Sequence, residues 1–330
     1  MTEILLTIFF ISVLLIFLGS GIWVAISMVG VSSIGMMLFT TRPVGDAMAT
    51  TIWGASSSWT LTALPLFVWM GEILFRTKLS ENLFEGLSPW MQKLPGGLVH
   101  VNVVGCALFA AISGSSAATV ATVGKMSIPE LRKRKYPESI LLGSLAGSGT
   151  LGLLIPPSII LIIYGVTVQE SIAKLFIAGI VPGIMIALIF MTYVMIWSLI
   201  NKKSMPTFKQ DFSLMEKVRK SGKLIPVILL IASVIGSIYT GIATATEAAS
   251  LGVVGALILS YFQKSLSLRT FKESLLGATK TSCMIAFILA GATFLSLAMG
   301  FTGLPRNLAL WIEGMELSPY VLIFVLMIFY

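Results

Sequence analysis

Ten long apolar runs, separated by short polar loops, make up most of this 330-residue sequence. Most runs approach the ~20 residues that one helix needs to cross the hydrocarbon core of a bilayer. Hydrophobic residues account for 56% of the chain and charged residues for 11%, whereas a soluble domain carries roughly 25% charged residues. The sequence therefore predicts an all-α polytopic membrane protein, with apolar runs near 4–18, 21–39, 60–75, 98–112, 139–165, 174–200, 224–240, 247–262, 283–300 and 319–330.

Basic residues indicate which loops stay in the cytoplasm. The net charge is +8 at pH 7, but the Lys and Arg residues lie in short loops between apolar runs, so they report orientation and do not predict nucleic-acid binding. The loops near 166–173 and 241–247 contain neither residue, whereas three loops are basic: 125–135, 201–223 and 264–280. This alternation fits one threading, in which the run 139–165 leaves the cytoplasm and each later run crosses in turn.

The apolar stretch 98–124 carries a Ser-Gly-Ser-Ser turn at residues 113–116. As a single helix, the stretch would extend ~40 Å, which is enough for one crossing of the membrane but not for two. One crossing would place Lys93 outside, against the positive-inside rule. We therefore expect a re-entrant hairpin that enters from the cytoplasm, turns at 113–116 and leaves by the same face. Ser115 or Ser116 is then the N-cap of its second helix.

A second unusual motif interrupts the run that follows. Residues 147–158 read Gly-Ser-Gly-Thr-Leu-Gly-Leu-Leu-Ile-Pro-Pro-Ser, and the two prolines must break a helix at this point. The carbonyls of Gly152 and Ile155 then lack helical partners, and a sodium ion is a suitable ligand for them. The hydroxyls of Ser113, Ser115 and Ser116 could complete an oxygen shell, and the helix N-terminus after the turn would attract a carboxylate. The structural alternative is a proline kink with small residues for close helix packing.

The chain also resembles itself at a displacement of about 220–225 residues. Residues 77–83 align with 302–308, Pro95 aligns with Pro319, and 21–38 align loosely with 241–260. The charges flanking the two copies differ, which favours inverted repeats of the kind found in secondary transporters. Because residue 330 corresponds to about residue 106, we expect the sequence to be C-terminally truncated, with the second hairpin missing.

Three segments carry a resemblance to a known family: 109–124, 152–158 and the Thr-Ala-Thr-Glu-Ala-Ala of 244–249. They resemble the large membrane subunit, DctM type, of tripartite ATP-independent periplasmic (TRAP) transporters, and the resemblance covers essentially the whole chain. It implies a multi-pass protein of the bacterial inner membrane that imports an organic acid, such as a C4-dicarboxylate or sialic acid, by sodium symport. It also implies an elevator-type movement and two protein partners, a small DctQ-type membrane subunit and a periplasmic DctP-type substrate-binding protein.

The resemblance also implies site residues. The first sodium site is expected at Ser113, Ser116, Gly152, Ile155 and Pro157. The substrate is expected beside it, at Ser115, Ser116, Ala117, Pro156 and Ser158. A second sodium site would belong to the second hairpin. Sodium is the coupling ion, no cofactor is expected, and the chain is not expected to be an enzyme.

These motifs divide the chain into four segments. Residues 1–97 are expected to form scaffold helices with an amphipathic interfacial arm at 79–93 that lies along the inner membrane surface. Residues 98–165 are expected to form the hairpin and broken helix of the transport domain. Residues 166–223 are linking helices with a basic cytoplasmic loop, and 224–330 are a partial second repeat. Outside the two motifs, Glu247 is expected to be a helix N-terminal acid and Glu72 a scaffold contact.

Three alternative functions remain. The first is a stand-alone ion-coupled carboxylate symporter with the same hairpin architecture. The second is an intramembrane enzyme with a hairpin serine, which is disfavoured because His100 is the sole histidine of the sequence. The third is a structural subunit that does not transport.

Overall fold

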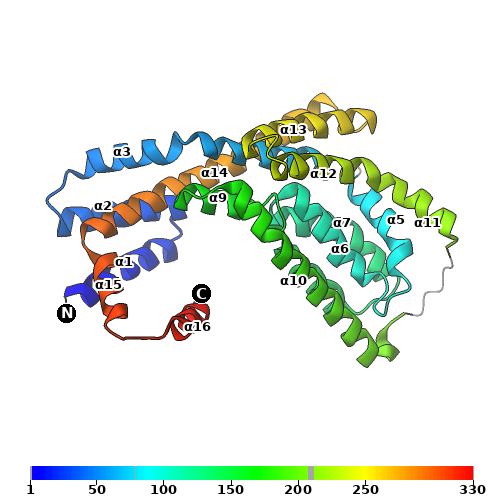
Figure 1. Ribbon diagram of the computed structural model, residues 1–330, viewed down its shortest axis with the longest axis horizontal. Helices are drawn as coiled ribbons and strands as arrows, with labels where there is room; N and C mark the ends of the chain where they lie inside the picture. The colour runs from blue at the N-terminus through cyan, green and yellow to red at the C-terminus, as the bar shows by residue number, and fades with distance from the viewer. Residues whose placement is uncertain (1, 78, 207–211, 330) are drawn as a thin grey trace. The chain divides into compact units, whose positions relative to one another are not determined.

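The computed structural model describes residues 2–77, 79–206 and 212–329, and every regular element in these ranges is a helix (Figure 1). The predicted all-α class is therefore confirmed. Two basic residues, Lys78 in the aligned stretch 77–83 and Lys209 in the basic loop 201–223, lie outside the described residues. Four helical stretches are long and apolar enough to cross a membrane, or five if Val44–Ser56 and Trp59–Phe75 form one bent span. The four are Ile172–Ile200, Leu214–Tyr239, Ala245–Phe262 and Leu268–Phe301.

Shorter apolar helices account for the other predicted runs. They include Val99–Ser113 and Ile159–Val168, which belong to the hairpin and to the broken helix. Neither is long enough by itself to meet the criterion for a span, in keeping with the expectation that both motifs interrupt regular crossings. The chain is a multi-pass membrane protein.

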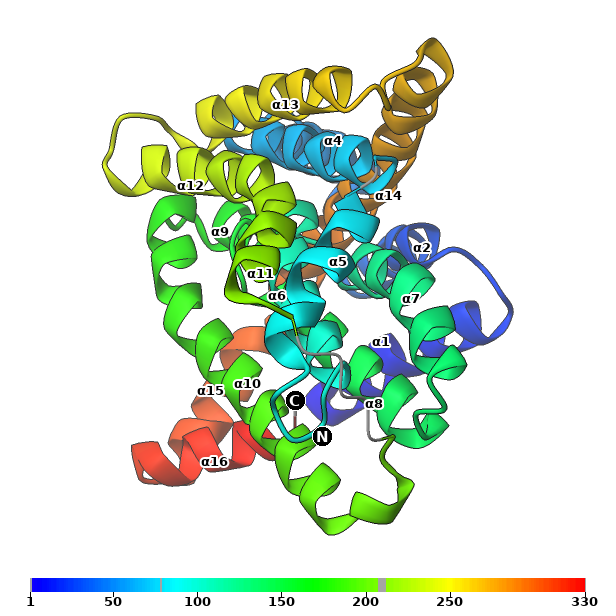
Figure 2. The same ribbon diagram turned by 90° about the vertical axis from the view of Figure 1, so that its right-hand side faces the viewer.

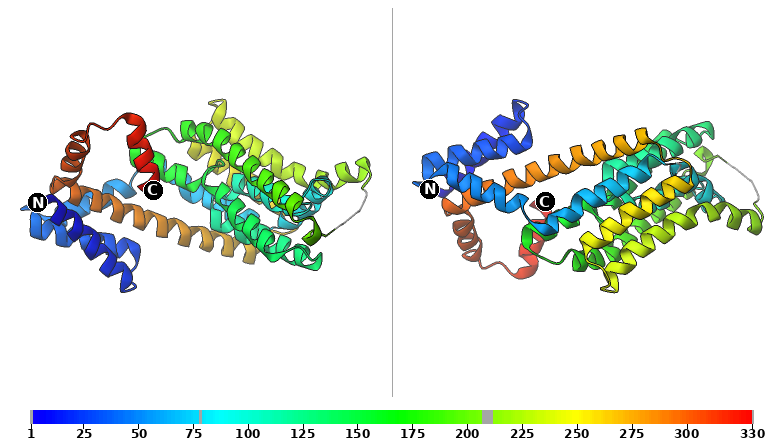
Figure 3. Two further views of the ribbon diagram at one scale, coloured as in Figure 1. Left: turned by 90° about the horizontal axis from the view of Figure 1, so that it is seen from below. Right: turned by 90° about the horizontal axis from the view of Figure 1, so that it is seen from above.

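The chain divides into two compact units, of which the larger is Trp59–Ser282. In this unit α4 and α13 run side by side, as Figure 2 and the right panel of Figure 3 show, and α6 packs against both α7 and α8. Its helices are η1 (Trp59–Thr62), α4 (Ala63–Phe75), α5 (Leu79–Met91), α6 (Val99–Ser113), α7 (Ser116–Lys133), α8 (Glu138–Gly149), η2 (Thr150–Leu153), α9 (Ile159–Val168), α10 (Ile172–Ile200), η3 (Lys202–Ser204), α11 (Leu214–Ser221), η4 (Gly222–Leu224), α12 (Ile225–Tyr239), α13 (Ala245–Phe262) and the first part of α14 (Leu268–Phe301).

The smaller unit joins Met1–Ser58 to Cys283–Tyr330. Two apolar clusters hold it together, one around Phe10, Val31 and Leu304 and one around Met36, Phe294 and Ala298. Its helices are α1 (Thr2–Gly19), α2 (Val24–Phe39), α3 (Val44–Ser56), the last part of α14, α15 (Leu304–Glu313) and α16 (Pro319–Phe329).

The amphipathic arm forms α5, and protein covers its apolar face. Leu83, Phe84 and Leu87 are buried, and α5 packs against α6, α7 and α11. The Trp90 indole N–H donates to Ser221 Oγ at 2.8 Å, which joins the arm to the end of α11. Figure 2 shows α11 beside α5.

The order of elements supports the predicted internal repeat. The apolar helix α4 is followed by the amphipathic α5 and the apolar α6, and α14 is followed in the same way by α15 and α16. Of the residues that aligned in sequence, 79–83 and 304–308 form the first turns of the two amphipathic helices. The inversion of the repeats and the four functional segments remain predictions.

Candidate functional site

The Ser-Gly-Ser-Ser segment forms a tight turn between two helices. Helix α6 ends at Ser113, Gly114 takes the left-handed conformation with φ of +59°, and α7 begins at Ser116. Ser115 is the N-cap, because its hydroxyl accepts a hydrogen bond from the Ala118 N–H at 3.4 Å. The predicted position of the turn and the predicted cap are both confirmed.

A small hydrogen-bond network holds the turn in shape. The Ser115 N–H donates to Ser113 Oγ at 3.3 Å, and Ser113 Oγ lies 3.0 Å from Thr119 Oγ1. Thr119 Oγ1 in turn donates to the Ser115 carbonyl at 2.8 Å. Sequence reasoning missed Thr119, which is fully buried. The signal was present, because residues four apart on a helix face one another and Ser115 and Thr119 have this spacing.

The second motif breaks its helix where the prolines predicted. Helix α8 ends at Gly149, a single 3₁₀ turn covers Thr150–Leu153, and α9 begins only at Ile159. Ser158 caps α9 and also donates its hydroxyl to the Leu153 carbonyl at 2.7 Å. The segment between the helices is therefore irregular in backbone but fixed at both ends.

The turn and the break lie against each other. The Ile159 N–H donates to the Gly114 carbonyl at 3.1 Å. A β-carbon on Gly114 would lie 2.5 Å from the Pro157 carbonyl oxygen, and one on Gly152 would lie 2.9 Å from the Ser116 nitrogen. These approaches are closer than a side chain permits, so both glycines are required for the two backbones to meet.

Several oxygen atoms of the turn and of the broken segment accept no hydrogen bond from the described residues. The buried Ser116 Oγ makes no hydrogen bond within the described part of the chain. In the same ranges, no backbone or side-chain donor reaches the carbonyl oxygens of Gly152, Ile155 or Pro157. An unpaired carbonyl at membrane depth is costly, and unwound backbone carbonyls are the groups that coordinate sodium in broken transporter helices.

The predicted site residues do not all face the junction. Ser113, Ser115, Ser116, Gly152 and Pro157 lie at or beside it. The Ile155 side chain packs against Gly183 of α10 and an apolar cluster. Because an isoleucine side chain has no ligand atom, Ile155 can contribute only its main-chain carbonyl. The Ser158 hydroxyl is engaged in its two hydrogen bonds. Ala117 is exposed and Pro156 is buried, and the described contacts join neither of them to the opposing motif.

The two acids outside the motifs have structural partners. The Glu247 carboxylate accepts from the Thr244 N–H at 2.8 Å while its own N–H donates to Thr244 Oγ1, a capping box that confirms its expected role as a helix N-terminal acid. Glu72 pairs with Arg76 at 3.2 Å.

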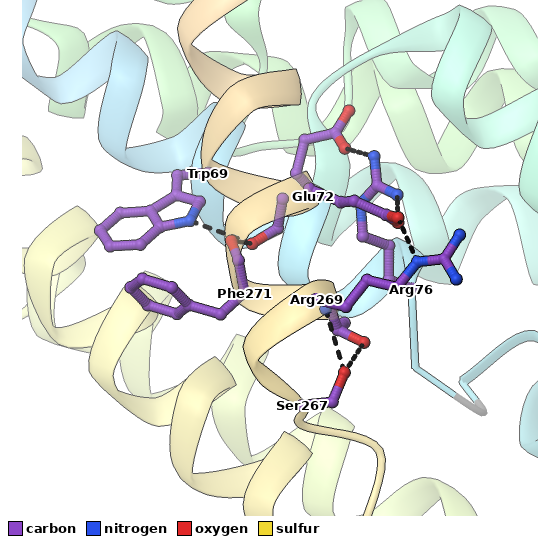
Figure 4. A network of polar contacts seen from close by, with 9 residues as sticks. Trp69, Glu72, Arg76, Ser267, Arg269 and Phe271 are labelled. Carbon is purple, nitrogen blue, oxygen red and sulfur yellow. Dashed lines mark hydrogen bonds and ion pairs between the residues drawn. The ribbon is translucent and has the colours of Figure 1, made fainter.

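Arg76 and Glu72 belong to a larger ion network. Arg76 also pairs with Glu273 of α14 at 3.0 Å, and Glu273 pairs with Arg269 at 2.8 Å (Figure 4). The Trp69 N–H donates to Ser274 Oγ at 3.3 Å in the same region. These contacts tie α4 to the start of α14.

Comparisons with known proteins give the chain its relatives. The family model described as the tripartite ATP-independent periplasmic transporter, DctM component, matches residues 10–330. The C4-dicarboxylate TRAP transporter large permease protein DctM of Pseudomonas aeruginosa is 33% identical over 291 residues, which are 88% of this chain and 67% of that protein.

Two further relatives carry other substrate names. The ectoine/5-hydroxyectoine TRAP transporter large permease protein UehC of Ruegeria pomeroyi is 32% identical over 326 residues, covering 98% of this chain and 74% of the relative. The sialic acid TRAP transporter large permease protein SiaM of Vibrio cholerae is 30% identical over 307 residues, covering 93% and 71%. These relatives are named as transporter permease subunits, which are not enzymes.

Proposed function

The chain belongs to the DctM family of TRAP transporter large permeases, and we propose that it is the large permease subunit of a sodium-coupled importer of an organic acid. The observation that carries the proposal is the junction of turn and broken helix. There, among the described residues, Ser116 Oγ and the carbonyls of Gly152 and Pro157 accept no hydrogen bond, and neither does the Ile155 carbonyl of the same irregular segment; Na⁺ is the partner that they would share.

These oxygen atoms suit sodium as a ligand set because they are neutral. Serine hydroxyls and main-chain carbonyls from Ser113, Ser116, Gly152, Ile155 and Pro157 would hold the ion, and each group is a lone-pair donor that needs no deprotonation. A sodium ion would be attracted to the negative ends of these dipoles and would join the turn to the break. The chain's own contribution is to hold the two backbones in register through Gly114 and Gly152.

The start of α7 supports a carboxylate as substrate. The first N–H groups of this helix have no intrahelical acceptors, and the helix dipole places partial positive charge at the same end. Ser115, Ser116 and Ala117 occupy this end, and Pro156 and Ser158 flank the break. A carboxylate bound here would lie beside the sodium ion, so each would favour binding of the other. The substrate class therefore includes C4-dicarboxylates, sialic acid and related acids, in line with the names of two relatives.

The family name supports a three-part system. We propose that the chain works in the bacterial inner membrane with a small DctQ-type membrane subunit and a periplasmic DctP-type binding protein that delivers the substrate. The hairpin and the broken helix would move together in an elevator-type cycle, because the Ile159–Gly114 hydrogen bond and the two close glycine approaches join them.

Uptake by the full-length protein, reconstituted with its small subunit and binding protein, tests the proposal. Labelled organic acids are offered with an inward sodium gradient and with an equal potassium gradient. We expect uptake with sodium and binding protein together, and background uptake without either. Uptake that needs sodium but no binding protein would indicate a stand-alone symporter, and equal uptake in potassium would contradict the sodium assignment.

A further inference from the structure

Helix α4 does not belong to the turn or the break, yet other elements hold it firmly beside them. A β-carbon on Gly252 of α13 would lie 2.5 Å from the Met70 sulfur, so α4 and α13 pack with very little space between them. The rings of Phe67 and Phe176 meet edge to face at 6.0 Å, which adds α10. The ion network of Figure 4 ties the other face of α4 to α14.

One residue of this helix meets the turn directly. A β-carbon on Gly71 would lie 2.9 Å from the Ser113 α-carbon and 3.4 Å from the Ser113 carbonyl oxygen. Both residues are buried. The neighbour is backbone, so it cannot rotate away as a side chain would. Ser113 is also not free to retreat, because it is followed by Gly114, whose backbone already lies against Pro157.

A corresponding contact lies behind the broken helix. A β-carbon on Gly179 of α10 would lie 2.5 Å from the Leu154 carbonyl oxygen, within the irregular segment that supplies Gly152, Ile155 and Pro157. One turn further along α10, a β-carbon on Gly183 would lie 2.9 Å from Cγ1 of the Ile155 side chain. Glycines spaced by four residues let a helix approach a neighbouring backbone closely.

We propose that Gly71 and Gly179 are positioning residues that set the distance between the turn and the break. This distance in turn sets the geometry of the oxygen cluster, by which we mean Ser116 Oγ and the carbonyl oxygens of Gly152, Ile155 and Pro157. Gly71 supports the Ser113 side, and Gly179 supports the Leu154–Pro157 side. A methyl group at either position displaces a segment of backbone that carries sodium ligands. The inference rests on the proposed sodium site and extends it to two helices outside both motifs.

The test uses alanine substitutions in the full-length protein, each with a matched control. Gly71→Ala is compared with Gly236→Ala on α12, where a β-carbon would have no atom within 4 Å. Gly179→Ala is compared with Gly143→Ala on α8, where a β-carbon would likewise have no atom within 4 Å. Thermal unfolding is measured across a sodium titration, then repeated with lithium, so that ion affinity and selectivity are separated from stability in ion-free medium.

We expect about tenfold weaker sodium affinity and an altered sodium-to-lithium ratio in Gly71→Ala and Gly179→Ala, because each new methyl group must displace backbone next to the proposed sodium ligands. Both controls should stay within about twofold of wild type, and all four variants should unfold cooperatively without sodium. Wild-type affinity and selectivity in the two test variants would overturn the inference, as would loss of fold in both, since the glycines would then be purely structural. A wild-type protein with no sodium-dependent stabilisation would instead refute the proposed function itself.

Discussion

The oxygen cluster and the ion network of α4 differ in whether their polar groups have partners within the protein. In the ion network, Glu72, Arg76, Glu273 and Arg269 form ion pairs of 3.2 Å or less with one another. At the junction of turn and break, Ser116 Oγ and three carbonyls have no donor within the described residues. Charges that satisfy one another hold helices together, whereas neutral oxygens without protein donors are suited to a ligand.

The largest effect is expected from a bulky side chain at the junction. In Gly152→Val the new β-carbon would lie 2.9 Å from the Ser116 nitrogen, so the turn and the break must separate. We expect about a hundredfold weaker sodium affinity, since overpacking costs up to about 3 kcal/mol. Sodium-dependent uptake by the full-length protein measures the change. Gly143→Ala on α8 is the control, because a β-carbon there has no atom within 4 Å. Equal loss of uptake in the two variants would contradict the placement of the sodium site at the junction.

Removal of one unpaired oxygen should have a smaller effect. Ser116→Ala deletes a buried hydroxyl that has no partner among the described residues, so its loss costs no protein hydrogen bond. We expect about tenfold weaker sodium affinity, because a hydrogen-bonding group to a charge is worth about 1.5–3 kcal/mol. Stability in sodium-free medium should be unchanged or slightly higher. A variant that loses stability but keeps wild-type sodium affinity would show that the hydroxyl is structural.

A substitution in the ion network should lower stability and leave sodium affinity nearly unchanged. Arg76→Gln leaves the Glu72 and Glu273 carboxylates without their shared cation, and the Arg76 side chain is only 27% exposed. We expect unfolding free energy to fall by about 1–3 kcal/mol, between the values for surface and buried pairs. Sodium affinity should change by less than about twofold, because the packing of α13 on α4 remains. Chemical unfolding and a sodium titration of the same sample decide; a stable variant with weak sodium binding would reverse the roles of the two regions.

The smallest effect is expected at the exposed Arg132–Glu138 pair, which joins the end of α7 to the start of α8. A hydrogen bond from Arg132 at 2.7 Å holds the pKa of Glu138 below its ordinary value. A lowered carboxylate pKa contributes stability above the unfolded-state pKa, and this contribution is lost as the pH falls through the folded-state pKa. Acidification should therefore destabilise wild type slightly more than Glu138→Gln. Arg132→Gln should behave like Glu138→Gln, and pH profiles of thermal unfolding that differ between the two variants would argue against the pair.

The sequence predicted local breaks better than it predicted long-range contacts. The turn at 113–116, the Ser115 cap, the proline break and the Glu247 cap all follow from residue types within a few positions, and the structure has each of them. The partner of Arg76, Glu273, lies 197 residues away, and no local pattern indicates it. Gly71 and Gly179 were missed for the same reason, because a glycine inside an apolar helix looks alike whether it meets lipid or another backbone. Ile155 was predicted as a site residue, but the sequence did not indicate which way its side chain points. Its packing against Gly183 of α10 determines that direction.

The most direct test of the proposed sodium site is ion binding to the purified full-length protein. Equilibrium dialysis with radioactive sodium, in competition with unlabelled sodium or potassium, is compared for wild type, Gly152→Val and Gly143→Ala. We expect saturable sodium binding that potassium does not displace, with wild-type affinity in Gly143→Ala and about a hundredfold weaker affinity in Gly152→Val. Wild-type sodium affinity in a folded Gly152→Val variant would show that the junction of turn and broken helix is not the sodium site.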